Sequence, residues 1–255
     1  MPLDSLGVAN ALRIIGAEAL RMWAVLGVET CGCGFRPDRR PKILFERHIF
    51  SRETHARWDG SHPDISNASP GGYERGGPDQ YARLQKAMAL DRHAALRSAS
   101  WGVGQVMGFN ATAAGFADVE RMVEAMAQSE NAQLEGMARF IVHKGLDDSL
   151  RDADWKRFAQ GYNGKDYWKR GYERLLADEQ ERLERNGLPD LRVRAAQEYL
   201  TFLGFDPRGV DGRMGDYTRA AMNRFQYEHE IAATADLDAA TYEALQVAVR
   251  ASAGP

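Results

Sequence analysis

Apolar residues that recur every three or four positions are the feature that most restricts the fold of this chain, because this spacing places them on one face of an α-helix. The first run consists of Val8, Leu12, Ile15, Ala19, Met22 and Leu26. It predicts a single helix that ends near Thr30, because Gly32 and Gly34 follow and glycine tolerates the left-handed geometry of helix ends. The same spacing recurs in later segments, at residues 81–88, 119–126, 134–141 and 155–162. The chain is therefore expected to be mainly α-helical.

Two segments interrupt this helical pattern. Residues 42–50 (KILFERHIF) form a short apolar run between Pro41 and Ser51, which predicts a strand. Alternate side chains of a strand share a face, and one face would carry Leu44, Glu46, His48 and Phe50. Residues 54–78 are rich in Gly, Pro, Asn, Ser and Asp, which predicts a loop with little regular structure.

A division of the chain is predicted at Asn186-Gly187-Leu188-Pro189, where a charged helix over about residues 166–185 must end. Glycine favours a helix stop, and proline cannot continue a helix. The remaining segment shows three more helix faces: Val193, Ala196, Leu200 and Leu203; Ala221, Met222 and Phe225; Tyr242, Leu245 and Val249. The sequence thus predicts one domain at residues 1–186 and a separate three-helix bundle at residues 187–255.

Charge and composition exclude several classes of protein. The net charge is −3 and neither part of the chain is basic, which argues against a nucleic-acid-binding protein. No apolar run approaches the roughly 20 residues of a membrane-spanning helix, and the N-terminal segment lacks the pattern of a secretory signal. Cys31 and Cys33 lie too close together for a relaxed disulfide, and with His48 they fall short of the four ligands of a closed zinc site. We expect a monomer without metal or cofactor.

Glu29 is the first candidate for catalysis. It lies three positions after Leu26 and extends the apolar stripe of the first helix, so its carboxyl should reach the core or its edge. Partial desolvation and the negative end of the helix dipole both disfavour the charged form, so its pKa should rise above the ordinary value of about 4.3. Such a protonated carboxyl suits the general acid of a glycosidase. The alternative is a glutamate that reaches solvent or pairs with an arginine.

Glu46 and His48 form a second candidate pair, because strand alternation would place them on one partly apolar face. Glu46 would then be a second carboxylate that stabilises an oxocarbenium ion or orients water, with His48 hydrogen-bonded beside it. The equally acceptable alternative is a structural salt bridge to Arg39, Arg40 or Arg47.

Three sequence motifs, taken in order, resemble those of goose-type lysozymes and soluble lytic transglycosylases. They are WAVLGVETCGCGF (residues 23–35), SWGVGQVM (residues 100–107) and FAQGYNG (residues 158–164). Residues 29–48 are also similar to the pattern Glu-Thr-x-Gly-x-Gly-Phe-x-Pro-Asp-Arg-Arg-Pro-x-Ile-Leu-Phe-Glu-Arg-His of phage N-acetylmuramidase domains. The resemblance covers most of residues 8–185 and implies a lysozyme-like α+β catalytic domain with a small sheet.

The resemblance also implies functions for individual residues. Glu29 would be the acid that cleaves the β-1,4 bond between N-acetylmuramic acid and N-acetylglucosamine, and Gln105, Tyr162 and Asn163 would line the sugar cleft. Goose-type enzymes carry acidic residues before the second motif, so Asp59 and Asp64 are candidates for positioning water. Sugar faces stack on aromatic rings, and Trp58 and Trp101 have the polar or glycine-rich surroundings that favour a place in the cleft.

Residues 193–231 resemble the three-helix peptidoglycan-binding domain, with its glutamine in the first helix, a Val-Asp-Gly-x-x-Gly turn and an Ala-x-x-x-Phe-Gln helix. Asp211, Gly212 and Gly215 should fix that turn. Such a domain keeps a catalytic domain near an insoluble substrate and raises its effective concentration there. The expected partner is bacterial peptidoglycan.

The resemblance leaves three functions open. A muramidase would use water to cleave the bond, a lytic transglycosylase would use the muramyl 6-hydroxyl, and a non-catalytic wall-binding or virion protein would cleave nothing. For a phage endolysin without a signal, the resemblance implies accumulation in the host cytoplasm until lysis, and action on the cell wall afterwards.

Overall fold

The computed structural model describes residues 1–30, 32–73, 79–164, 167–234 and 236–252. Its helices are α1 (Ser5–Ile15), α2 (Ala19–Thr30), α3 (Arg47–Glu53), α4 (Gln80–Met88), α5 (Arg92–Arg97), α6 (Val119–Gln128), α7 (Glu130–His143), α8 (Asp147–Arg151), α9 (Trp155–Asn163), α10 (Tyr172–Asn186), α11 (Leu191–Phe202), α12 (Asp216–Glu228) and α13 (Ala239–Ala251). Its strands are β1 (Ile43–Phe45), β2 (Ala99–Trp101) and β3 (Val106–Met107), and short 3-10 helices are η1 (Gly108–Asn110) and η2 (Tyr167–Arg170). The mainly helical fold with a small sheet confirms the predicted fold class.

The first apolar run forms two helices, so the prediction of a single helix from Val8 to Thr30 is wrong. α1 ends at Gly16, whose left-handed φ of 69° lets its N–H donate to the carbonyl of Leu12. α2 then begins at Ala19. The spacing continues across the break because Ile15 and Met22 are both buried in the same core. Hydrophobic periodicity therefore reported the buried face and missed the turn.

The predicted strand over residues 42–50 is also too long. β1 covers Ile43–Phe45 and pairs antiparallel with β2, with Ile43 opposite Trp101, and β2 pairs with β3. The chain turns into α3 at once, since the N–H groups of Ile49 and Phe50 donate to the carbonyl of Glu46. Ile49 and Phe50 are consecutive and both buried. A helix that packs against a core can bury two consecutive side chains, whereas a strand points them to opposite faces. The proposed strand face that joins Glu46 to Phe50 does not exist.

Beyond α3 the chain follows turns as far as residue 73, in agreement with the predicted loop. Asp59 holds this loop together because its two carboxylate oxygens accept hydrogen bonds from Ser51 and Ser66, at 2.9 and 2.6 Å. Residues 74–78 of the predicted loop, residue 166 of the predicted charged helix and Cys31 lie outside the described residues.

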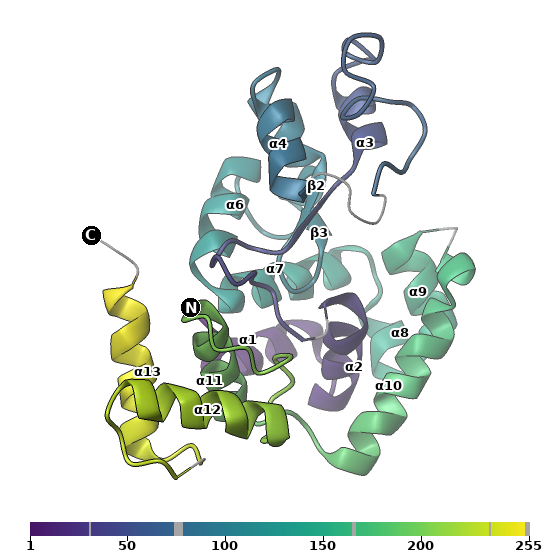
Figure 1. Ribbon diagram of the computed structural model, residues 1–255. Helices are drawn as coiled ribbons and strands as arrows, with labels where there is room; N and C mark the ends of the chain where they lie inside the picture. The colour runs from purple at the N-terminus through teal and green to yellow at the C-terminus, as the bar shows by residue number, and fades with distance from the viewer. Residues whose placement is uncertain (31, 74–78, 165–166, 235, 253–255) are drawn as a thin grey trace.

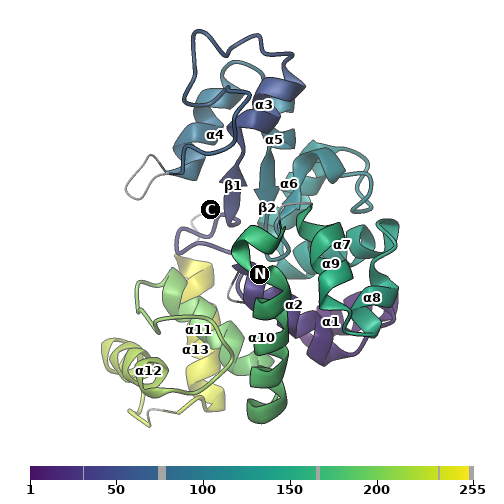
Figure 2. The ribbon, with the colours of Figure 1, turned by 90° about the vertical axis from the view of Figure 1, so that its right-hand side faces the viewer.

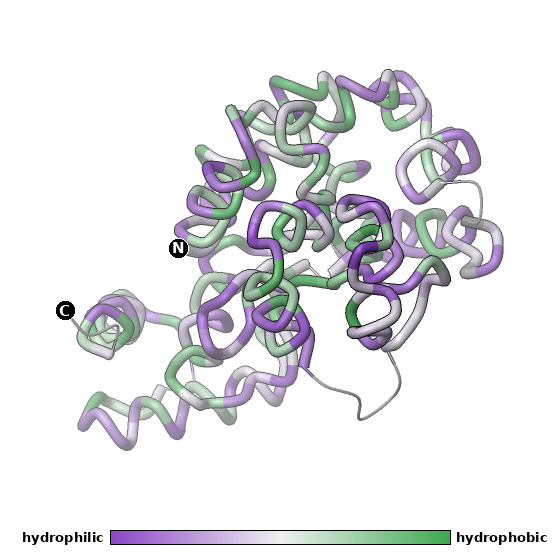
Figure 3. Tube along the Cα trace, turned by 90° about the horizontal axis from the view of Figure 1, so that it is seen from above, coloured by the Kyte–Doolittle hydropathy of each residue, from purple (hydrophilic) through white to green (hydrophobic). Residues whose placement is uncertain are grey.

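The sheet joins two groups of helices in the N-terminal region, which we define as residues 1–186. α3, α4 and α5 lie at one end of the sheet, while α2, α8, α9 and α10 lie at the other (Figures 1 and 2). One core of buried side chains continues through both groups, from Met22 and Leu26 of α2 to Phe45, Leu84 and Met137. Hydrophilic and hydrophobic residues alternate along the helices (Figure 3), a pattern typical of helices with one face toward a core and the other toward solvent.

The C-terminal region, residues 187–252, contains the predicted helices α11, α12 and α13 around a core of its own. Gln197 of α11 is buried and fixes the turn before α12: its side-chain oxygen accepts hydrogen bonds from the N–H groups of Asp211 and Gly212 at 2.9 and 2.8 Å. Gly212 has a φ of 71°, and an added Cβ would lie 2.7 Å from Pro189. These contacts explain the Val-Asp-Gly turn.

Within the described residues, no helix combines the length and the apolar character that a membrane crossing requires.

Candidate active site

Glu29 is half-buried at the penultimate position of α2. Its carboxylate oxygen Oε1 accepts a hydrogen bond of 3.0 Å from the side-chain amide of Asn163, the last residue of α9. Two of the predicted site residues, 134 positions apart in sequence, therefore meet at the adjoining ends of two helices. The buried residues Val25 and Leu26 anchor the preceding turn of α2, which holds the carboxyl at the edge of the core.

Tyr162 lies beside this pair and packs against the core. Its ring stacks on Phe158 at 5.3 Å, and its hydroxyl donates a hydrogen bond of 2.6 Å to the carbonyl of Gly104. Burial raises the pKa of Tyr162 well above its usual range, and the nearby negative charge of Glu29 raises it further. Tyr162 is thus a neutral hydrogen-bond donor that ties α9 to the β2–β3 turn.

The β2–β3 turn packs against the end of α2. Thr30 donates to the carbonyl of Val103 at 3.0 Å, and the Lys42 ammonium donates to the carbonyl of Thr30 at 2.9 Å. The amide of Gln105 is used inside this turn: it donates to the carbonyls of Gly102 and Lys42, at 2.8 and 3.3 Å, and accepts from the Ser100 hydroxyl at 2.8 Å. Gln105 holds the turn in place, and a direct contact with sugar stays a prediction.

Gln133 on α7 is a supporting residue that sequence reasoning missed. It is fully buried, accepts a hydrogen bond from the N–H of Val103 at 2.8 Å and donates one to the carbonyl of Met126 at 2.8 Å. The turn approaches it so closely that an added Cβ on Gly102 would lie 2.6 Å from its side chain. The sequence did contain a signal for this role: Gln133 lies one helical turn before Met137, so a polar amide stands on the apolar face of the helix.

Trp101 is not part of a sugar-binding surface, which corrects the expectation from its surroundings. Only 2% of the residue is exposed, and its indole N–H donates to the carbonyl of Leu96 at 3.1 Å. A glycine-rich neighbourhood suggested exposure, but the central strand of the sheet turns this side chain into the core. Trp58 is half-buried in the loop after α3, where its ring meets the edge of His62 at 5.8 Å.

Glu46 and His48 do meet, although for a different reason from the one predicted. The carboxylate oxygen Oε2 of Glu46 lies 3.2 Å from Nδ1 of His48 across the first turn of α3, and the Tyr73 hydroxyl donates to the same oxygen. Burial and the adjacent Glu46 carboxylate raise the pKa of Tyr73 to about 12, so Tyr73 stays a donor.

The arginines weighed as partners of Glu46 have other contacts. Arg40 pairs with Asp38 at 2.6 Å. Arg47 donates to the carbonyl of Ser69 at 2.9 Å, and Arg39 donates to the carbonyl of Val249 at 3.0 Å. Glu46 directly follows β1, whereas Lys42, which donates to the carbonyl of Thr30 in α2, directly precedes it. The four residue steps from Lys42 to Glu46 span about 13 Å of extended chain, so β1 separates the Glu46 pair from this contact with α2.

Asp64 forms a surface ion pair. Its carboxylate accepts two hydrogen bonds from the Lys86 ammonium, at 2.9 and 2.7 Å, and about half of its side chain is exposed. Partial burial raises the pKa of Asp64, but the hydrogen bonds to its carboxylate and the positive charge of Lys86 together outweigh this, and the net shift is downward. With Asp59 committed to Ser51 and Ser66, neither loop aspartate is held in the same way as Glu29.

Comparison with known protein families agrees with this geometry. A family model described as N-acetylmuramidase matches residues 18–184. This range includes Glu29, Glu46, Tyr162 and Asn163. The chain belongs to the N-acetylmuramidase family. A second model, described as a putative peptidoglycan binding domain, matches residues 189–245 of this muramidase. The muramidase is therefore a glycoside hydrolase of the lysozyme type with a peptidoglycan-binding domain after its catalytic part.

Among solved structures, the muramidase is similar to the crystal structure of the Burkholderia AP3 phage endolysin. The two chains are 37% identical, the similarity covers 72% of this chain and 71% of the endolysin, and the TM-score is 0.64. A comparison with curated proteins finds no match.

Proposed function

We propose that this muramidase is an endolysin that hydrolyses the β-1,4 bond between N-acetylmuramic acid and N-acetylglucosamine, with Glu29 as the general acid. The observation that carries the proposal is the half-buried Glu29 carboxyl at the C-terminal end of α2, oriented by the amide of Asn163. Both partial burial and the negative end of the helix favour the protonated form of a carboxyl, which is the form that donates to a leaving sugar oxygen.

In this mechanism Glu29 gives its proton to the bridging oxygen as the glycosidic bond breaks, and its carboxylate then faces a sugar with oxocarbenium character. Asn163 keeps the carboxyl in one orientation during the transfer. Two other residues support the site without acting on the proton. Tyr162 ties the β2–β3 turn to α9, and Gln105 holds that turn closed. Water that completes hydrolysis leaves a reducing end.

We propose Glu46 as the second carboxylate, which stabilises the oxocarbenium-like transition state or orients water. The Tyr73 hydroxyl donates to its carboxylate, His48 lies 3.2 Å away, and only 17% of the Glu46 side chain is exposed. Asp64 is less suited to this function because it is more exposed and already neutralised by Lys86.

The first test is the variant Glu29→Gln, which keeps the shape of the side chain and removes the proton that is transferred. We expect loss of clearing of purified peptidoglycan by at least roughly a hundredfold, as for the removal of a general acid, with wild-type binding to the wall. Glu18→Gln is the matched control, because Glu18 is exposed just before the other end of α2. An undiminished Glu29→Gln would move the acid to Glu46.

Mass spectrometry of the released fragments separates the related reactions. Reducing muramyl ends support the hydrolase, whereas 1,6-anhydro ends would make the enzyme a lytic transglycosylase that uses the same acid. If the wild type binds the wall but releases no soluble fragments, the protein is a wall-binding protein without catalytic activity.

We propose that the catalytic domain comprises residues 1–186 and the wall-binding domain residues 187–255. α10 ends at Asn186, Gly187 has a left-handed φ of 76°, and the two family models match on either side of this point. The wall-binding domain would hold the enzyme on peptidoglycan, and accumulation in the host cytoplasm until lysis fits an endolysin.

A further inference from the structure

Arg194 of α11 crosses from the C-terminal region into the core of the N-terminal region. Only 1% of its side chain is exposed, although arginine is rarely buried without partners. Its guanidinium forms a two-point contact with the buried carboxylate of Glu130, the first residue of α7, at 2.6 and 2.8 Å. Planar, paired contacts of this kind fix the orientation of both groups.

The same guanidinium also holds the loop that follows Glu29. The carbonyl of Gly32 accepts hydrogen bonds from two nitrogens of Arg194, with a distance of 2.9 Å to Nε. Gly32 lies three positions after Glu29 and has a φ of 76°, and its N–H closes the end of α2 by donating to the carbonyl of Leu26 at 3.0 Å. Arg194 therefore contacts the backbone that ends the helix on which Glu29 lies.

Glu130 completes this arrangement from the opposite side. Besides Arg194, its carboxylate accepts hydrogen bonds from the N–H groups of Gly34 and Leu3, at 2.7 and 2.9 Å. Gly32 and Gly34 are thus held by one arginine and one glutamate that belong to different regions of the chain. Both side chains are almost completely buried.

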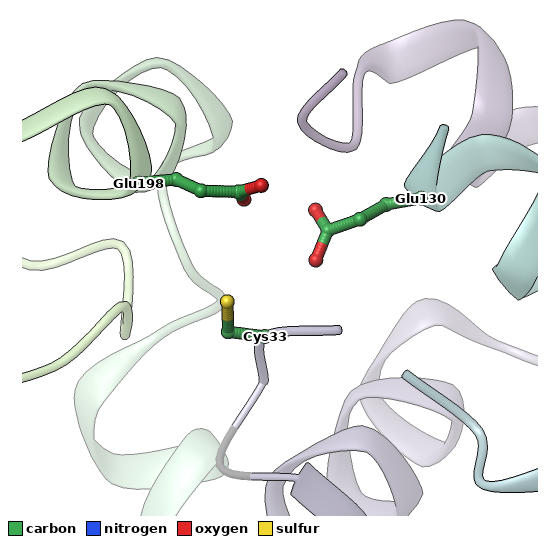
Figure 4. Close-up of side chains that lie close together, drawn as sticks. All are labelled: Cys33, Glu130 and Glu198. Carbon is green, nitrogen blue, oxygen red and sulfur yellow. The ribbon is translucent and has the colours of Figure 1, made fainter. Parts of the chain in front are cut away.

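Arg194 supplies positive charge to a cluster of buried acidic side chains. Cys33, Glu130 and Glu198 face one another (Figure 4) and lie close enough to hold a cation, but the guanidinium already supplies positive charge to Glu130. Burial raises the pKa of Glu198 well above its usual range and that of Cys33 to about 12, which favours the protonated form of both side chains. Arg194 is paired most closely with Glu130, at 2.6 Å, while the carboxyl of Glu198 lies 3.6 Å from the same guanidinium nitrogen.

We propose that Arg194 is a positioning residue for Glu29: the wall-binding domain supplies the side chain that holds the end of α2, so the catalytic domain reaches its active geometry only with the wall-binding domain docked. This inference rests on the proposed function of Glu29. It gives the C-terminal region a second task besides binding the wall, and it explains why a buried arginine spans the two regions.

The test uses full-length variants and soluble glycan strands without cross-links, so that adhesion to the insoluble wall does not limit the rate. Arg194→Met keeps an unbranched apolar stem in place of the arginine stem and loses every hydrogen bond to Gly32 and Glu130. We expect kcat to fall at least roughly tenfold with KM changed less than about twofold, since the substrate still binds while the acid is displaced. Pull-down onto purified peptidoglycan should remain at the wild-type level.

Arg39→Met is the matched control. Arg39 also spans the two regions, through hydrogen bonds to the carbonyl of Val249 and the hydroxyl of Ser252, but it has no contact with Gly32 or Glu130 among the described residues. It should keep the wild-type kcat. Arg194→Lys is a milder variant that keeps the charge and loses the planar contact, and we expect an intermediate kcat from it.

A double variant separates positioning from folding. Glu130→Gln in the Arg194→Met background removes the unpaired buried carboxylate, so the melting temperature should recover in part. The kcat should stay low, because nothing holds the carbonyl of Gly32. Recovery of kcat together with the melting temperature would show a purely structural role and overturn the proposal.

Glu29→Gln is assayed in parallel. If Glu29→Gln is inactive and Arg194→Met keeps the wild-type kcat, positioning by Arg194 is refuted while the proposed function stands. If Glu29→Gln keeps the wild-type kcat, the proposed function fails and the role of Arg194 in placing the acid fails with it.

Discussion

Asn163 and Gln105 are both amides from motifs of the site, yet their hydrogen bonds give them different functions. Asn163 donates to the carboxylate of Glu29. Gln105 donates to the carbonyls of Gly102 and Lys42 and makes no such bond among the described residues. At this scale, one amide contacts the carboxyl of Glu29 and the other closes the turn beside it, and the motif alone did not distinguish them.

Asn163→Ala should therefore lower kcat on soluble glycan strands by about tenfold, the size expected when one hydrogen bond to an ionisable carboxyl is lost. The melting temperature should change little, because Asn163 is half-buried at the last position of α9. Asn223→Ala, an exposed position on α12, serves as the control. Equal losses in kcat from both variants would argue against a specific contact with Glu29.

At the scale of elements, the breaks between neighbouring helices and strands decide where the site lies. The turn at Gly16 gives α2 a direction of its own, and the early end of β1 places Glu46 at the start of α3. Periodicity predicted which residues of these segments are buried. Periodicity did not predict the breaks. Whether Gly16 adopts a left-handed conformation, and whether two consecutive side chains are both buried, depends on the elements that pack against these segments.

Gly16→Ala should lower the free energy of unfolding by about 1 kcal/mol, the usual cost of a left-handed backbone for a residue with a side chain. The new Cβ itself fits, since its nearest neighbour is Nη1 of Arg151 at 3.4 Å. Urea denaturation measures the loss. Gly60→Ala is the control, because nothing lies within 4 Å of its Cβ position. An equal loss of stability in Gly60→Ala would show that the left-handed backbone of Gly16 is not the cause.

At the scale of the whole molecule, the two regions share an interface and are not linked by α10 alone. The rings of Phe35 and Phe202 meet edge to face at 6.2 Å, Arg39 reaches α13, and Arg194 enters the N-terminal core. A charged group buried at such an interface makes stability depend on pH, because folding changes the affinity of the group for a proton.

Glu198 should make the folded protein less stable as pH rises. Its pKa is raised in the folded state, so above the ordinary value of about 4.5 the unfolded chain releases its proton first, and unfolding becomes more favourable until the folded pKa is passed. The pKa of Glu130 is lowered in the folded state, so this residue changes the stability only at pH values below that range. The melting temperature of the wild type, measured from about pH 5 to about pH 9, should fall relative to that of Glu198→Gln, whose side chain stays neutral.

The control for this experiment is Glu228→Gln, an exposed position on α12 that should follow the wild type at every pH. Parallel curves for the wild type and Glu198→Gln would mean that Glu198 does not hold its proton in the folded state.

The sequence by itself determined the helical character, the three-helix C-terminal region and the place of Glu29 at the end of an apolar helix, because these follow from spacing between residues close along the chain. Three ordered motifs also indicated the family. Only the tertiary structure decided that Trp101 is buried, that Gln105 closes a turn and that Arg194 meets Gly32. Arg194 and Gly32 are 162 positions apart, and no local pattern records which distant partner stabilises a buried charge.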